Sequence, residues 1–164
     1  MNLGNVKRRD APIGRWVWLL PIAYSAHVVE EAFGGHGLAA WIIDLGGVRF
    51  SIAGFLGINL AGLAIIAAAT WASRRSPAWR WALVSGGTIL FVNGISHVAA
   101  SAAMRYYVPG MWTGIAFYIP LGAVLLLRVR RVMSPRPFWA AAAAGFAIHA
   151  AVLWVVFGTS GLHP

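Results

Sequence analysis

The chain has 164 residues, of which 60% are hydrophobic and 10% are charged, and its mean hydropathy is +0.72. Soluble domains carry about 25% charged residues, so this composition excludes an ordinary soluble domain and predicts a single integral membrane domain over residues 1–164. The net charge of +9 would suit a nucleic-acid partner. We expect none, because the basic residues follow the membrane topology described below. The chain has no cysteine, which excludes disulfides and thiolate chemistry.

Five apolar segments are long enough to cross a bilayer as helices. The fold class predicted is therefore all-α, an integral membrane bundle of about five transmembrane helices. The first segment follows a basic stretch, as a cleaved signal peptide would, but its apolar run continues to Phe33, so we interpret it as an uncleaved span. The predicted spans are 16–33, 52–72, 81–104, 112–127 and 138–157.

The basic residues set the predicted orientation. When the spans alternate in direction, eleven of the thirteen Lys and Arg residues fall on one side and only Arg49 and Arg105 on the other. The positive-inside rule then places the N-terminus in the cytoplasm and the C-terminus outside, in what we expect to be a bacterial inner membrane. Membrane lipids, anionic headgroups above all, are the expected partners of this charge. Outside, residues 34–48 predict an interfacial helix or lid, because glycine pairs bracket a short apolar patch.

Polar side chains from all five spans share one depth. His27, Asn59, His97, Tyr118 and His149 each lie six to eight residues below the outer end of their span, which is roughly 9–12 Å at the helical rise. Charged groups within spans usually face the bundle interior and indicate function. We therefore predict a polar pocket in the outer half of the bilayer. The pocket is lined by His27, Glu30, Glu31, Asn93, His97 and His149.

Three short motifs occur along the chain: HVVEE at 27–31, NGISH at 93–97 and YVPG at 107–110. With these motifs the chain resembles the HXXEE family of integral membrane proteins, whose signatures are HxxEE, NxxxH and YxPG and whose function is unknown. The resemblance runs from the first span to the start of the fourth. It implies that the family's marked positions are His27, Glu30, Glu31, Asn93, His97, Tyr107, Pro109 and Gly110. His149 lies outside the motifs.

The favoured interpretation is a metal-dependent enzyme that acts on a small, lipid-soluble substrate. His27 and Glu31 lie one helical turn apart, and with His97 and His149 they offer nitrogen and oxygen ligands that suit Fe, Zn or Mn. One metal is easier to hold than two, because the chain has one HxxEE and not a repeated pattern. Glu30 is predicted to be a general acid/base or a second carboxylate ligand. Asn93 is predicted to orient either His97 or the substrate. Tyr107 is predicted to anchor the chain at the interface or to donate a hydrogen bond to the site.

Two other interpretations stay open. Glu30 and Glu31 could titrate apart and do metal-free acid/base chemistry between the aromatic walls of Trp16, Tyr24, Phe91 and Tyr118, as in an isomerase or a terpene-cyclase-like enzyme. Alternatively, the protein is a transporter, a haem protein with His97 and His149 as axial ligands, or a structural protein. In that structural case the glutamates would pair with Arg105 or Arg49. The sequence leaves the oligomeric state and the substrate open.

Overall fold

The computed structural model describes residues 13–45, 47 and 51–158, and within these ranges all regular secondary structure is helical. Four basic residues on which the predicted orientation rests lie outside the described residues: Lys7, Arg8, Arg9 and Arg49. The elements are η1 (Arg15–Trp18), α2 (Leu19–Phe33), α3 (Leu38–Asp44), α4 (Ile52–Arg75), η2 (Pro77–Trp79), α5 (Arg80–Met104), α6 (Met111–Thr113), η3 (Gly114–Tyr118), α7 (Ile119–Arg130), α8 (Pro135–Leu153) and η4 (Trp154–Gly158). The all-α prediction is confirmed for this part of the chain.

Four helical segments are long and apolar enough to cross a membrane: Ile52–Arg75, Pro77–Met104, Met111–Arg130 and Pro135–Phe157. Each contains nearly all of a predicted span and extends it by a few residues. The first predicted span also forms a helix, but α2 alone has 15 residues, fewer than the roughly 20 that a span needs. It is preceded directly by the 3₁₀-helix η1, so that helical structure runs from Arg15 to Phe33. That residues 16–33 cross the membrane therefore stays a prediction.

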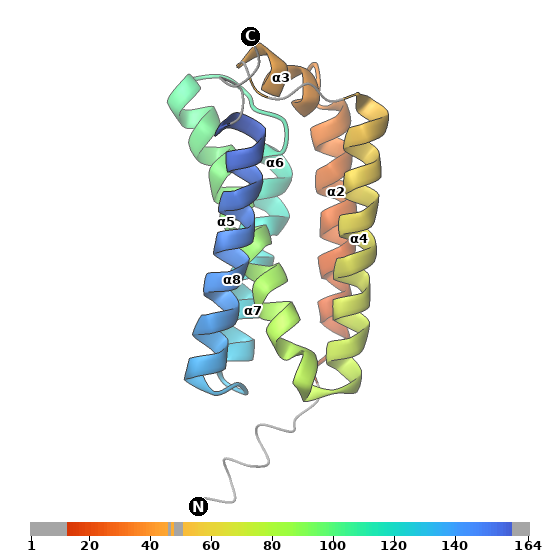
Figure 1. Cartoon of the computed structure of the whole chain (residues 1–164), viewed down its shortest axis with the longest axis vertical. Helices are drawn as coiled ribbons and strands as arrows, with labels where there is room; N and C mark the ends of the chain where they lie inside the picture. The colour runs from red at the N-terminus through yellow and green to blue at the C-terminus, as the bar shows by residue number, and fades with distance from the viewer. Residues whose placement is uncertain (1–12, 46, 48–50, 159–164) are drawn as a thin grey trace, which may run out of the picture.

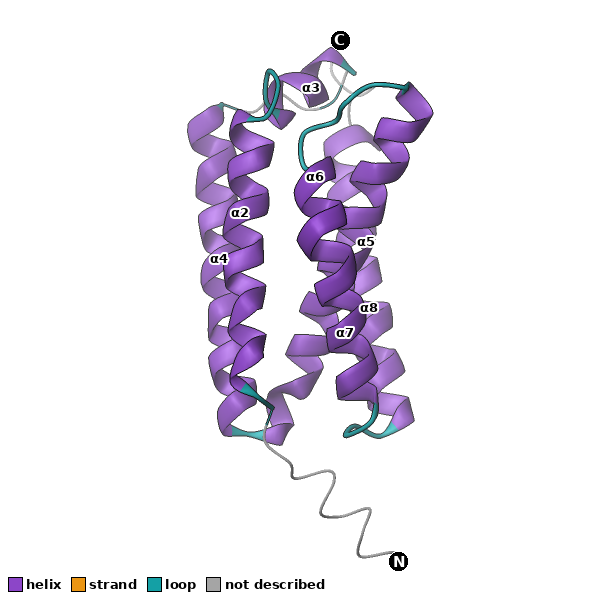
Figure 2. Cartoon of the chain, turned by 180° about the vertical axis from the view of Figure 1, so that it is seen from behind, coloured by secondary structure: helices purple, strands orange, loops and turns teal. Residues whose placement is uncertain are grey.

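The long helices run side by side in two groups (Figures 1 and 2). One group is the pair α2 and α4, and the other contains α5, α7 and α8. Small residues allow the closest approaches, because a side chain at Gly145 of α8 would collide with the Ser85 backbone of α5. The Ser85 hydroxyl also donates to the Ala141 carbonyl at 2.8 Å. In the other group, the Tyr24 hydroxyl donates to Asn59 Oδ1 at 2.9 Å and joins α2 to α4.

The short helix α3 lies across the top of both groups (Figure 1). Its Leu38, Trp41 and Ile42 are buried in a small core with Phe55 and Val108. A helix therefore does form within residues 34–48, at the end of the bundle opposite η1 (Figure 1). It covers the upper end of the helices that carry the site described below.

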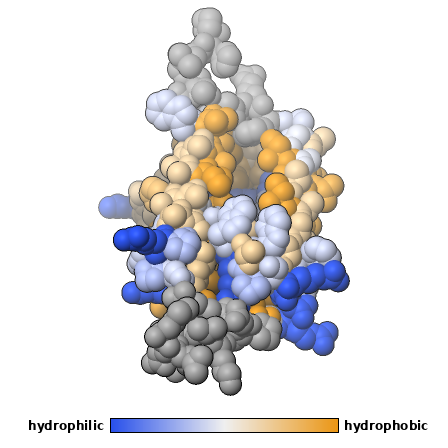
Figure 3. All heavy atoms as spheres, turned by 60° about the horizontal axis from the view of Figure 1, so that its bottom comes forward, coloured by the Kyte–Doolittle hydropathy of each residue, from blue (hydrophilic) through white to orange (hydrophobic). Residues whose placement is uncertain are grey.

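Hydrophilic side chains gather around the lower end of the molecule, and apolar ones above it (Figure 3). Three arginines lie over tryptophan rings, Arg75 over Trp71, Arg128 over Trp16 and Arg130 over Trp139, at 4.1, 5.0 and 5.6 Å from the ring centroids. Paired cations and tryptophans are typical of a membrane–water interface. Large apolar side chains such as Ile58, Leu60 and Ile65 are exposed, as expected for a surface in contact with lipid tails.

Candidate metal centre

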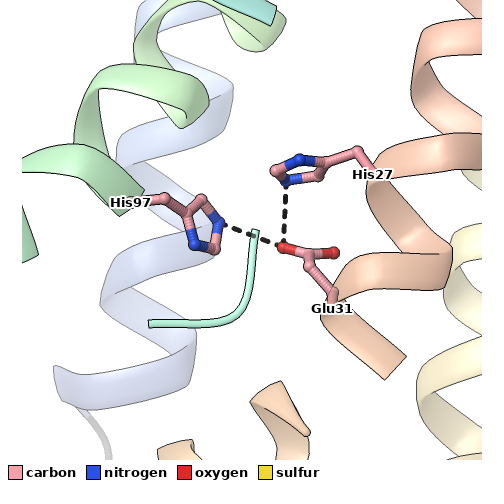
Figure 4. Close-up of side chains that lie close together, drawn as sticks. All are labelled: His27, Glu31 and His97. Carbon is pink, nitrogen blue, oxygen red and sulfur yellow. Dashed lines mark ion pairs between the residues drawn. The ribbon is translucent and has the colours of Figure 1, made fainter. Parts of the chain in front are cut away.

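Two histidines converge on one carboxylate between the two helix groups (Figure 4). His27 and Glu31 lie four residues apart on α2 and so share one face, and His97 reaches them from α5. Glu31 Oε1 lies 3.3 Å from His27 Nε2 and 3.1 Å from His97 Nε2. His27 is only 2% exposed, Glu31 6% and His97 8%. Their ligand atoms all lie within 4.8 Å of one another, so they surround a single point.

Gly110, the last residue of the YVPG motif, packs directly against both imidazoles. Its φ is +98°, which glycine adopts readily and other residues do not. A Cβ there would lie 2.7 Å from His97 Nδ1 and 2.9 Å from His27 Cε1. The preceding Val108 is buried, and its backbone N–H donates to Ser101 Oγ at 3.0 Å. The loop before α6 is therefore held tightly against the histidines.

Gly94, inside the NGISH motif, brings the π-helix η3 close to α5. A Cβ at Gly94 would lie 2.9 Å from Tyr118 Cβ and 3.2 Å from the Gly114 carbonyl oxygen. This approach places the buried Tyr118 ring on His27, with centroids 4.0 Å apart and planes 25° apart. Single π-helical turns occur often at functional sites, and here the turn forms one wall of the histidine pair.

Glu30 faces away from this group, toward the start of α6. Its Oε1 accepts from the Tyr107 hydroxyl at 2.8 Å and from the Trp112 backbone N–H at 3.0 Å. Its Oε2 accepts from the backbone N–H and the hydroxyl of Thr113, at 2.7 and 2.5 Å. Glu30 thus caps the N-terminus of a helix from another part of the chain, where a carboxylate is favoured. It is not part of the group that could hold a metal.

Tyr107 lies in the loop between α5 and α6, outside the long apolar helices. Burial and the hydrogen bond to Glu30 raise the pKa of the Tyr107 hydroxyl to about 12. The hydroxyl therefore stays protonated at physiological pH and remains a donor to Glu30. Of the two roles predicted for Tyr107, the structure places its hydroxyl on Glu30 and not on the three converging residues.

Two ring nitrogens and one amide oxygen are buried with no hydrogen-bond partner among the described residues. His27 Nδ1 lies 2.7 Å from Thr113 Oγ1, but His27 Nε2 has no hydrogen bond, because its short approach to Glu31 lacks hydrogen-bond geometry. His97 Nδ1 and Asn93 Oδ1 are likewise buried without a partner. Buried polar atoms are normally satisfied, so an unpaired Nε2 on His27, beside the Glu31 carboxylate, is compatible with a bound metal ion.

Two further predicted pocket residues are not among the three converging ligands. His149 on α8 is buried, but its Nε2 lies 3.4 Å from Ser96 Oγ, and it is not one of the three grouped ligands. Asn93 lies one turn before His97 on α5 and makes no hydrogen bond to it. Among the described residues, neither glutamate forms an ion pair with an arginine. Arg49, one of the two expected partners, lies outside those residues.

Thr113 contacts both Glu30 and His27 but is not among the site residues predicted from the sequence. A signal was present, since Thr113 follows the YVPG turn by three residues, at the third position of a helix that begins after Gly110. The importance of Gly94 and Gly114 was also missed. No pattern in the sequence marks where two backbones come closest.

A protein-family model described as "Protein of unknown function with HXXEE motif" matches residues 18–125. The matched region contains all three converging residues, together with Thr113 and Gly110. The comparison with curated proteins and the comparison with solved structures each gave no match.

Proposed function

The chain belongs to the HXXEE family, whose function is unknown, and from that premise we propose that it is an integral membrane metalloenzyme. In this proposal His27, Glu31 and His97 hold one divalent transition metal. The enzyme acts on a small, lipid-soluble molecule.

The observation that carries the proposal is the convergence of two imidazole Nε2 atoms on one carboxylate oxygen, all three buried. Catalytic metal sites commonly use three protein ligands and keep a position open for substrate. Two histidines and one carboxylate are such a set, found with both Zn and non-haem Fe, and Mn accepts the same ligand types. Bound there, the ion would supply Lewis-acid or redox chemistry.

The proposed setting is the outer half of a bilayer, crossed by five spans with the N-terminus inside. Two features support it. The arginine–tryptophan contacts and the hydrophilic rim lie at the lower end of the molecule, as the cytoplasmic face should (Figure 3). His27, Glu31 and His97 all lie in the half of their helices nearest the opposite end.

A lipid-soluble substrate is supported by an open surface hollow of about 350 Å³ near the end of α5, with an almost wholly apolar lining. Its lining includes Val98 and Met111, which follow His97 and Gly110 in the chain. Its lining residues are Val98, Ser101, Ala102, Arg105, Tyr106, Tyr107 and Met111.

Metal analysis tests the proposal most directly. We expect the full chain, purified in detergent, to contain one Fe, Zn or Mn per chain, and Glu31→Gln to lose it while keeping its helical content and melting temperature. Asp44→Asn is the matched control, because Asp44 is an exposed carboxylate on α3 that pairs only with His36 among the described residues. It should keep the metal. A folded wild-type chain that takes up none of the three ions would contradict the metal site.

Turnover needs a second readout. Lipid extracts of membranes that contain the wild-type chain should differ from extracts that contain Glu31→Gln, by at least one consumed and one formed molecule. Identical extracts would contradict an enzymatic role even if a metal is bound. A difference between the extracts without any bound metal would instead favour the acid/base mechanism.

A further inference from the structure

We propose that Glu30 and Thr113 are positioning residues that fix the tautomer of His27, so that its Nε2 is the nitrogen left free to bind the metal. This inference rests on the proposed metal site. It gives the two adjacent glutamates of the HxxEE motif different tasks: Glu31 binds the ion, and Glu30 prepares the histidine.

The first step concerns Glu30, which accepts four hydrogen bonds through its two oxygens. Two of these come from backbone N–H groups of Trp112 and Thr113, at the positive end of a helix. A protonated carboxyl cannot accept at every one of these contacts, so the arrangement favours the ionised carboxylate. An ionised Glu30 has no proton to donate.

The second step concerns Thr113, whose hydroxyl has a single proton. The hydroxyl lies 2.5 Å from Glu30 Oε2 and 3.4 Å from the Gly110 carbonyl oxygen. The shorter contact to a carboxylate is much the stronger hydrogen bond. The proton therefore points to Glu30, and Thr113 Oγ1 is left as an acceptor toward His27.

The third step concerns His27, whose Nδ1 lies 2.7 Å from that oxygen. Since Thr113 Oγ1 can only accept there, Nδ1 must donate and so holds the ring proton. In the neutral ring Nε2 then has a free lone pair. It lies 3.3 Å from Glu31 Oε1 without a hydrogen bond, as one metal ligand lies beside another. Metal-binding histidines usually have their second nitrogen held in this way.

The test uses three single substitutions. Thr113→Val removes the hydroxyl that connects Glu30 to His27 and keeps the side-chain shape. Thr113→Ser restores a hydroxyl. Tyr107→Phe is the matched control, because it also removes one hydroxyl donor from Glu30 but does not touch His27. Changes at the outer partners of a metal ligand typically lower metal affinity by about 10- to 100-fold.

We expect Zn²⁺ affinity to fall by about 10- to 100-fold in Thr113→Val, to return to within about threefold in Thr113→Ser, and to stay within about threefold in Tyr107→Phe. Equal losses in Thr113→Val and Tyr107→Phe would overturn the proposal, because the loss would then follow from any weakened contact of Glu30 and not from the hydroxyl that meets His27.

Nitrogen-15 NMR of histidine-labelled protein without metal gives a readout that a purely structural role would not change. The His27 signals, assigned by difference from His27→Gln, should show a protonated Nδ1 in the wild-type chain and in Tyr107→Phe. In Thr113→Val the proton should move to Nε2. A wild-type His27 with an unprotonated Nδ1 would overturn the proposal without any variant. This readout needs no metal. It therefore tests the tautomer of His27 separately from the proposed metal site.

Discussion

The two halves of α5 both bury polar side chains, but they treat them differently. In the first half, the Ser85 hydroxyl donates to the Ala141 carbonyl of α8, and the Thr88 hydroxyl donates to the Val84 carbonyl one turn back. In the second half, Asn93 Oδ1 and His97 Nδ1 are buried without a hydrogen-bond partner. The same helix thus carries hydroxyls that are satisfied within the fold and, at Asn93 and His97, two buried atoms that have no partner among the described residues.

This difference separates polar residues that hold helices together from those with no partner in the described part of the fold. A satisfied hydroxyl in an apolar bundle fastens one helix to another or returns to its own backbone, and it needs nothing further. An open ring nitrogen or amide oxygen costs free energy unless something binds it. Position along the helix alone would not distinguish these groups, whereas their hydrogen bonds do.

The largest effect is expected from a substitution of His97, in the second half of α5. His97→Ala removes one of the three converging ligands, so metal affinity should fall by more than the roughly 100-fold that changes at outer partners cause. The control is His149→Ala, which removes a buried histidine that lies outside the group. It should leave metal content at one per chain. Metal titration of both purified variants checks this, and equal losses would show that His149 is also a ligand.

The next effect tests the loop that closes this region from above. Gly110→Ala would place a Cβ on a residue whose φ is +98°, at 2.7 Å from His97 Nδ1 and 2.9 Å from His27 Cε1. The backbone strain should lower the free energy of unfolding by about 1–3 kcal/mol, and the displaced rings should weaken metal binding as well. Thermal unfolding in detergent, with and without added metal, measures both. Gly57→Ala is the control, because a Cβ at Gly57 has no neighbour within 4 Å. If Gly110→Ala matched that control, Gly110 would have no role in placing the histidines.

Much of the fold and part of the candidate site could be predicted from the sequence. The apolar runs predicted where the helices lie, because length and hydropathy decide which segments can cross a bilayer. The motifs pointed to His27, Glu31 and His97. The split between Glu30 and Glu31 was out of reach, since neighbours on a helix point about 100° apart and packing decides which of them meets α5. His149 shares their depth, but depth says nothing about direction around a helix axis. The contact between Thr113 and His27 joins residues 86 positions apart in the sequence, which no local pattern predicts.

The smallest expected effect belongs to the first half of α5. Ser85→Ala removes the hydrogen bond to the Ala141 carbonyl and leaves that oxygen bonded only within its own helix. A typical intramolecular hydrogen bond contributes about 0.5–1.5 kcal/mol net, so the free energy of unfolding should fall by about 1 kcal/mol. Metal content should not change, because Ser85 lies three helical turns before His97 on α5 and none of its contacts reach the centre. Unfolding and metal analysis of the same preparation measure both quantities. Loss of metal from Ser85→Ala would mean that the two halves are coupled through the packing of α5 on α8, and that satisfied polar groups also determine the geometry of the centre.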